Sequence, residues 1–372
     1  MERTPRLRPL LARPGARYGC VRDGFCCGDV HSIGPLRAAD LVLLKRSAPG
    51  SFRLEPEVDQ QVMRTTPNGD CVCLDRGACA LHAAAGAHGK PMVCRRYPFT
   101  LVATPEGGRV GTAHRCPCRT MGERPLVDLA EADLSLRDHG GRLRANARAP
   151  MRISISRRQR VSFGTYVGLE TPLLERLAAG EAPLSVLGTE PALPALDSTT
   201  WAQVGRHFVD RAGGPRQSAR IMAWFGSALL ALSSDRELAP DHGRPWKAAF
   251  DRAEARAPVP RAPRDVIADW LADLVWGMLW VDAASFDVMR AEWTAKLLVV
   301  DLLARSLVSG GARPDRAAAE ALLVVEVSTS LPDWVAVVSA LRPAPPLPWK
   351  SLFPAHDRNG ANAESTQFGK ST

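Results

Sequence analysis

The nine cysteines of this 372-residue chain all lie between residues 20 and 118. The nine tryptophans show the opposite distribution, because the first of them is Trp201. A single well-mixed domain would rarely separate two residue types so completely. The separation predicts a small cysteine-rich module followed by a cysteine-free domain. The cysteines are Cys20, Cys26, Cys27, Cys71, Cys73, Cys79, Cys94, Cys116 and Cys118.

The residue pattern along the chain predicts a mainly α protein. A chain of this length can form two domains with separate cores. Apolar residues recur at helical spacing through most of the second half, whereas the region around the cysteines mixes short helical and strand-like stretches. We therefore expect a small irregular α+β cysteine-rich module followed by an all-helical domain. The expected division is a basic disordered arm over 1–17, the cysteine module over 18–124, connecting helices and a linker over 125–198, the helical domain over 199–342 and a disordered tail over 343–372.

Local signals predict short elements in the first half of the chain. The glycine pair Gly107–Gly108 lies between two apolar stretches, over 100–103 and 110–112, and so predicts a hairpin. A second pair, Gly140–Gly141, is expected to break a helix over 125–146. The other expected elements are a helix over 35–47, a short strand over 70–74, a strand over 152–155, a helix over 162–179 and a proline-rich connector over 181–198.

Caps and helix breakers mark the second half. Thr200 and Gln203 have the spacing of a capping box, and the helix that begins there is expected to end at Gly213–Gly214. The helix expected over 263–282 carries three aspartates spaced by four residues, for which we favour a solvated face over a metal site. Further expected helices follow Pro215, Ser285 and Pro314, and the acidic positions are Asp265, Asp269 and Asp273.

The sequence predicts a cytoplasmic protein without membrane contact. Its first residues lack the apolar stretch of a secretory signal, and no apolar run reaches the roughly 20 residues that a membrane-spanning helix needs. In a reducing compartment an odd number of crowded cysteines favours metal ligation over disulfides. We therefore interpret the cysteine-rich module as metal-binding.

Charge gives little support for a nucleic-acid partner. The formal net charge is +9, and the densest basic segment, over 3–22, has no interleaved aromatic residues on which bases could stack. A solvated basic arm is therefore favoured over a nucleic-acid site. A protein substrate or protein partner stays open as a prediction.

Thiolates select zinc or iron–sulfur clusters over hard cations. Four cysteines suffice for a zinc site or for a [4Fe–4S] cluster, so nine are more than one site needs. Either there are two sites or some thiols have another role. Cys26 and Cys27 are adjacent and would point to opposite faces of an extended chain. Cys71 with Cys73, and Cys116 with Cys118, are two residues apart and would share a face.

Four ordered segments together resemble the YkgJ-type cysteine-cluster family, whose members are regarded as zinc- or iron-chelating. These segments are C-x5-C-C-G from Cys20, C-x-x-L-D from Cys71, C-x-L-H from Cys79 and K-P-x-V-C-R-R-Y-P-F around Cys94. The resemblance covers about residues 18–118. Flagellin lysine N-methylases are similar to this family in their cysteine cluster. That similarity implies an iron–sulfur protein that methylates lysine with S-adenosylmethionine.

The chain departs from the family pattern at three points. Asp23 stands where the family has a second cysteine, and Cys73 stands where it has phenylalanine. Between Cys79 and Cys94 this chain carries an insertion of small residues with His82 and His88. The first departure removes one expected thiolate, and Cys73 is a candidate to replace it.

Two hypotheses follow for the function. One is an iron–sulfur protein with redox or lysine methyl-transfer chemistry, and the other is a zinc-stabilised module whose helical domain binds a protein partner. Whether the chain is an enzyme stays open, because no glycine-rich phosphate loop or nucleotide motif marks a site for S-adenosylmethionine. All nine cysteines are candidate ligands. The histidines His31, His82, His88 and His114 are weaker candidates, and Arg95 and Arg96 are candidates for thiolate activation, anion binding or salt bridges.

Overall fold

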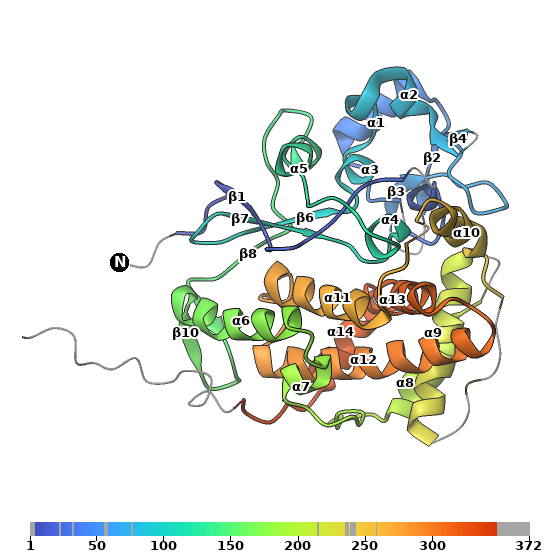
Figure 1. The fold of residues 1–372 in the computed structure, drawn as a ribbon. Coiled ribbons are helices and arrows are strands. Elements are labelled where there is room, and N and C mark those ends of the chain that lie inside the picture. The colour runs from blue at the N-terminus through green and yellow to red at the C-terminus, as the bar shows by residue number, and fades with distance from the viewer. Residues whose placement is uncertain are drawn as a thin grey trace, which may run out of the picture.

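The computed structural model describes residues 4–21, 24–31, 33–55, 59–75, 77–213, 216–234, 238, 243–257 and 259–347. These residues form two layers (Figure 1). The upper layer contains small sheets, short helices and all nine cysteines. The lower layer consists mostly of the helices that follow residue 162. The prediction of a mainly α protein is confirmed.

A four-stranded sheet lies at the base of the upper layer, facing the helices (Figure 1). The pair β6–β7 is antiparallel, with Leu101 opposite Val110, which confirms the expected hairpin. The N-terminal strand β1 extends the sheet in parallel to β7, with Leu11 opposite Arg109. The strand order is β1 (Leu10–Ala12), β7 (Gly108–Thr112), β6 (Phe99–Ala103) and β8 (Ala147–Arg148).

The prediction of a disordered N-terminal arm is wrong for residues 4–17. Strand β1 pairs with the edge of β7, so its backbone hydrogen bonds are made by the sheet rather than by water. Gly107 permits this close approach, because its φ is 154° and a Cβ atom there would lie 2.2 Å from the carbonyl oxygen of Pro9. Sequence composition could not reveal this pairing, since the partner strand lies about a hundred residues away.

Short elements surround the cysteines. The helix expected over 35–47 is confirmed as α1 (Ala38–Ser47). The strand expected over 70–74 is wrong, because Asp70 and Cys71 form isolated bridges to two different partners, Gly28 and Thr65. The chain bends there instead of extending. The remaining elements are η1 (Phe25–Cys27), β2 (Phe52–Glu55), β3 (Gln60–Met63), β4 (Leu74–Asp75), β5 (Ala78–Cys79), α2 (Ala80–Ala85), η2 (Gly86–Gly89), α3 (Met92–Arg96) and α4 (Pro117–Thr120).

The connecting region is less helical than predicted. Helix α5 (Leu129–Leu136) ends before Gly140–Gly141, because the chain then folds back and Arg137 pairs with Leu143. Gly141 has a φ of 75°, which suits that turn. The strand and helix expected next are confirmed as β9 (Arg152–Ser154), which pairs with β10 (Arg160–Ser162), and α6 (Phe163–Ala178). The expected connector contains a short helix, α7 (Pro183–Leu187).

The helices of the lower layer begin close to the predicted caps. The capping box of Thr200 and Gln203 is present at the start of α8 (Trp201–Arg211). The helix expected over 263–282 ends earlier, at Gly277, and residues 279–283 form turns. Pro215 lies outside the described residues. The other helices are α9 (Gln217–Ser234), α10 (Lys247–Ala255), α11 (Pro263–Gly277), α12 (Phe286–Ser309), α13 (Pro314–Thr329) and α14 (Pro332–Ala340).

One apolar core extends through the lower layer and reaches into the upper one. It contains Trp224, Trp246 and Trp293, each at most 2% exposed. Phe25, directly before the cysteine pair, packs edge-to-face on Phe250 of α10 with ring centroids 6.0 Å apart. The helical layer therefore supports the segment that carries Cys26 and Cys27. The predicted domain boundaries stay a prediction.

The acidic face of α11 is not solvated as predicted. Asp273 is buried and Asp269 is partly buried, and the two bind Arg13, Arg119 and His114, whereas Asp265 is exposed. The carboxylate of Asp273 accepts hydrogen bonds from the Arg13 Nε at 2.7 Å and from the Arg119 guanidinium at 2.8 Å. Asp269 and Asp273 therefore contact arginine side chains from distant segments of the chain, where the prediction had them in contact with water.

The start of the predicted disordered tail is packed on the core. Ala344 and Leu347 are buried, and the Arg290 guanidinium donates a hydrogen bond to the Pro345 carbonyl at 2.8 Å. Residues 348–372 lie outside the described part of the chain. Among the described residues no single helix has the length and apolarity for a bilayer span, although the bent pair α13–α14 passes that test by length and composition.

Candidate metal centre

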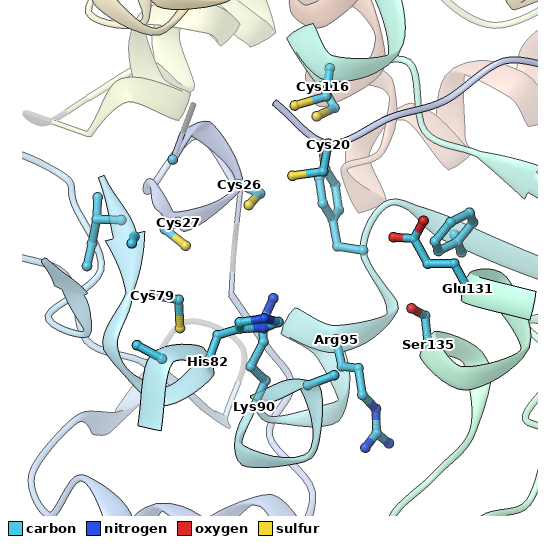
Figure 2. Close-up of a pocket in the computed structure, with 18 of the residues that line it drawn as sticks. Cys20, Cys26, Cys27, Cys79, His82, Lys90, Arg95, Cys116, Glu131 and Ser135 are labelled. Carbon is cyan, nitrogen blue, oxygen red and sulfur yellow. The ribbon is translucent and has the colours of Figure 1, made fainter. Parts of the chain in front are cut away.

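The nine cysteines line two adjoining cavities. The larger has a volume of about 640 Å³ and the smaller about 130 Å³. Cys26, Cys27 and Cys79 line both. Figure 2 shows five of the cysteines around the larger cavity, with side chains that come from separate segments of the chain. The larger cavity adds Cys20, Cys116 and Cys118, and the smaller adds Cys71, Cys73 and Cys94.

Cys26 and Cys27 lie together rather than on opposite faces. Their backbone forms the 3-10 turn η1 and not the extended chain on which the opposite-face prediction rested. The thiol of Cys27 hydrogen-bonds with that of Cys26, which, together with burial, raises the pKa of Cys27. Both thiols therefore line the same two cavities.

Cys71 and Cys73 form a second hydrogen-bonded pair. The contact with Cys71 lowers the pKa of Cys73 to about 7, whereas the same contact and burial raise the pKa of Cys71. Cys94, on α3, differs from them, because burial raises its pKa to about 12.

Cys116 and Cys118 are positioned by the start of α4. Pro117 between them occupies the first turn of this helix, where proline costs no hydrogen bond. Arg119, which directly follows Cys118, is held by hydrogen bonds to the carboxylates of Asp269 and Asp273. The backbone N–H of Val21 donates a hydrogen bond to the Cys118 Sγ at 3.2 Å. The ion pairs of α11 thus hold this pair of thiols at the larger cavity.

The donor set fits a thiolate-bound group, although the thiols do not converge on one point. All nine cysteines are free of disulfides. Across the described residues no three histidine, cysteine or acidic side chains are placed to hold a single metal ion. A zinc site needs four ligands at about 2.0–2.3 Å from one atom, whereas an iron–sulfur cluster takes its thiolates at separate irons. Thiols spread around a cavity suit the second kind of group better.

The four candidate histidines have different surroundings. His31 is 8% exposed, lines the smaller cavity and has no hydrogen-bond partner at either ring nitrogen. Burial, reinforced by the charge of Arg115, lowers its pKa, so the ring is neutral near pH 7. His82 lines the larger cavity, and exposed His88 lines neither. His114 is instead bound to Asp273 at 2.8 Å.

The two candidate arginines do not act alike. Arg95 is buried, lines the larger cavity and donates to the carbonyl of Arg137. Burial lowers its pKa. Arg96 donates instead to the side-chain oxygen of Asn146 and lines neither cavity. Asp23, the departure from the family pattern, lies outside the described residues.

Sequence analysis missed Tyr97 and Arg115, which both line the smaller cavity. The hydroxyl of Tyr97 and the Nε of Arg115 are buried without hydrogen-bond partners. Tyr97 lies within the R-R-Y-P-F segment, and Arg115 directly precedes Cys116. Their position next to the cysteines was the available signal, but their shared cavity depends on the fold.

A third cavity, of about 750 Å³, lies between β7, α6 and α11, and no cysteine lines it. Its lining includes Arg109 and Glu170, which form a buried ion pair at 2.7 Å. Arg109 also stacks on Trp276, with its guanidinium carbon 4.1 Å from the ring centroid. This cavity is separate from the thiols.

No family model, no curated protein and no solved structure matches the chain.

Proposed function

We propose that this chain is a metal-binding cysteine-cluster protein whose thiols hold an iron–sulfur cluster in the larger cavity. The observation that carries the proposal is that nine cysteines, none of them in a disulfide, line two adjoining cavities. The cysteines come from segments separated by up to about a hundred residues, so local sequence does not explain their assembly. Cysteine thiols gathered at one concave site favour soft metals.

The residues that would hold the cluster are those with thiols at the larger cavity. Cys26, Cys27 and Cys79 lie on one side of it, and Cys20 and Cys116 lie across from them (Figure 2). Cys118 also lines this cavity. Six thiols exceed the four that a [4Fe–4S] cluster uses. Lys90 and Arg95 line the same cavity and offset the negative charge of thiolates.

Bound there, an iron–sulfur cluster would supply one-electron chemistry. The 640 Å³ cavity lies within the range for small-molecule sites and has room for a substrate beside the thiols. Following the resemblance to the cysteine-cluster family, the reaction to test is transfer of a methyl group from S-adenosylmethionine to a lysine. The helical layer would then serve to fix the cysteine-rich module and present a protein substrate.

The test is anaerobic purification followed by a visible spectrum and counts of iron, sulfide and zinc per chain. We expect a brown protein with iron and sulfide in near-equal amounts. Cys79→Ser and Cys116→Ser are expected to lose most of the iron and the visible absorption. Cys94→Ser, whose thiol lines only the smaller cavity, and His88→Ala, at an exposed site, are expected to keep both.

A colourless protein that contains zinc would contradict the iron–sulfur proposal and favour the zinc-stabilised module that binds a protein partner. A folded protein that holds neither metal, with all nine thiols titratable, would contradict both. Equal iron loss in Cys79→Ser and Cys94→Ser would show that the cluster is not confined to the larger cavity.

A further inference from the structure

The smaller cavity is lined by three side chains that carry buried polar groups without hydrogen-bond partners, although Arg115 also donates through its Nη1 to the Ser330 hydroxyl at 3.4 Å. These groups are the imidazole of His31, the hydroxyl of Tyr97 and the Nε of Arg115. The rings of His31 and Tyr97 are 5.1 Å apart, and the guanidinium carbon of Arg115 is 5.9 Å from the Tyr97 centroid. The three therefore form one group rather than three isolated exceptions.

Leaving these groups unpaired is costly. Each buried polar group without a hydrogen bond costs about 1–3 kcal/mol, and a charged one costs more. Native proteins pair almost all such groups with protein, ordered water or a ligand, so three of them around one cavity indicate that an ion or molecule within it pairs them. Each can donate a hydrogen bond, since guanidinium and phenol carry donors and a neutral imidazole carries one N–H. Their common requirement is a hydrogen-bond acceptor.

The charge around the cavity selects the kind of acceptor. Lys90 and Arg115 are the cationic side chains that line it, and none of its described lining residues is aspartate or glutamate. The carboxylate of Glu326 lies close by, but its two oxygens already accept from the Trp270 indole at 3.0 Å and from the Arg115 backbone N–H at 3.0 Å. Glu326 partly offsets this positive charge, whereas the unpartnered donors of Arg115, Tyr97 and His31 remain without an acceptor.

We propose that the smaller cavity binds a compact monovalent anion, held by Arg115, Tyr97 and His31 beside the shared cysteines. A volume of 130 Å³ is about four times the ~30 Å³ that a water molecule occupies in the liquid, so the anion has only a few heavy atoms. Cys26, Cys27 and Cys79 line this cavity as well as the larger one, which brings the anion next to the proposed cluster ligands. Anion binding does not depend on which metal the thiols hold.

Bromide is the probe, because it is compact, monovalent and visible by anomalous X-ray scattering. Gluconate at equal ionic strength is the control, since its carbon chain is too long for the cavity. We expect bromide, but not gluconate, to raise the melting temperature of the full-length protein as purified, and the rise to saturate. Anomalous scattering from bromide-soaked crystals should place the ion at Arg115 and Tyr97.

Two variants test the assigned donors. Arg115→Gln and Tyr97→Phe are each expected to weaken bromide binding about tenfold, because each removes a hydrogen-bond donor to a charged ligand. Tyr97→Phe removes a single oxygen atom and keeps the ring, so it guards against a folding defect. Arg46→Gln, at an exposed site on α1, is the matched control and should bind bromide like the wild type.

Metal content is measured in the same samples. This measurement distinguishes a failure of the anion site from a failure of the proposed iron–sulfur cluster. Weaker bromide binding with unchanged metal supports the anion site whatever the metal is. Equal melting temperatures in bromide and gluconate would overturn it. So would a bromide ion found only outside the cavity. If His31→Phe lowers metal content while Arg115→Gln and Tyr97→Phe bind bromide normally, His31 is a metal ligand and the anion assignment is wrong.

Discussion

At the scale of single residues, the structure places charges where the sequence pattern suggested none. Arg109 faces inward from a short strand of the sheet and is 1% exposed. Burial raises the pKa of its partner Glu170, and the positive charge of Arg109 partly offsets this increase. A buried ion pair is weak as a source of stability, but removal of one partner leaves an uncompensated charge.

We therefore predict that Arg109→Met lowers the free energy of unfolding by roughly 3–5 kcal/mol. The methionine would also lose the stacking on Trp276. Urea denaturation followed by tryptophan fluorescence measures the change. The double variant Arg109→Met/Glu170→Gln should recover part of the loss, because it removes the stranded carboxylate. No recovery would mean that packing, and not charge, dominates at this site.

At the scale of elements, α8 and α9 approach each other closely through two glycines. A Cβ atom at Gly226 would lie 2.6 Å from the carbonyl oxygen of Gly205 and 2.9 Å from a methyl group of Val209. Glycine at these positions lets the two helices touch through their backbones. Glycine in a helix destabilises it by about 0.5–1 kcal/mol relative to alanine. At these positions the close packing of the two helices offsets that loss.

Substitution by alanine should change the free energy of unfolding in opposite directions at a packed helical glycine and at an open one. Gly226→Ala is expected to lower the free energy of unfolding by about 1–3 kcal/mol, because the helices must move apart. Gly164→Ala, in α6, meets no atom within 4 Å and is expected to raise it by about 0.5–1 kcal/mol. Thermal denaturation of both variants measures the difference. A destabilised Gly164→Ala or a neutral Gly226→Ala would contradict the packing argument.

At the scale of the whole molecule, the ion pairs of α11 connect the N-terminal strand, the α4 cysteines and the helical layer. Burial alone would raise the pKa values of Asp269 and Asp273, but the charge of Arg119 lowers both below the usual 3.8, and Arg13 contributes to this at Asp273. A carboxylate whose pKa is lower in the folded state stabilises the fold above its unfolded pKa. That contribution is lost as the pH falls below about 4.

We predict that stability falls steeply on acidification and that Asp269→Asn flattens this dependence. The variant should be less stable than the wild type near neutral pH, and the gap should narrow as the pH falls from about 6 to about 3. Melting temperatures across that range measure both curves. Parallel curves would show that the ion pairs of Asp269 contribute nothing to the pH dependence. Asp265→Asn, on the exposed side of α11, is the control and should follow the wild type.

Sequence reasoning succeeded where the signal was local. The capping box at Thr200, the glycine pair of the β6–β7 hairpin and Pro314 at the start of α13 depend on neighbours within a few residues. It failed where distant partners decide the conformation. Residues 4–17, predicted as a disordered arm, contain a strand that pairs with β7, and Asp70, in the predicted strand over 70–74, bridges to Gly28. The helix predicted beyond Leu136 is replaced by a turn closed locally between Arg137 and Leu143.

The candidate site shows the same division. The clustered cysteines alone predicted soft-metal chemistry, because thiolate preference is a property of the residue type. Their grouping around two cavities, and the sharing of three thiols between them, depended on the tertiary structure. Tyr97 and Arg115 carry no signal of their own, and they became a candidate anion site only when the fold buried them beside His31.

The sequence by itself therefore determined the helical class, most of the helix starts and the candidate ligands. The tertiary structure decided which charges are buried, how the N-terminal strand pairs and which side chains share a cavity. The physical reason is the distance along the sequence over which each kind of interaction acts. Propensity, capping and ligand chemistry belong to a residue and its near neighbours, whereas burial and electrostatic pairing depend on contacts between segments such as Arg13 and Asp273 that only the folded chain brings together.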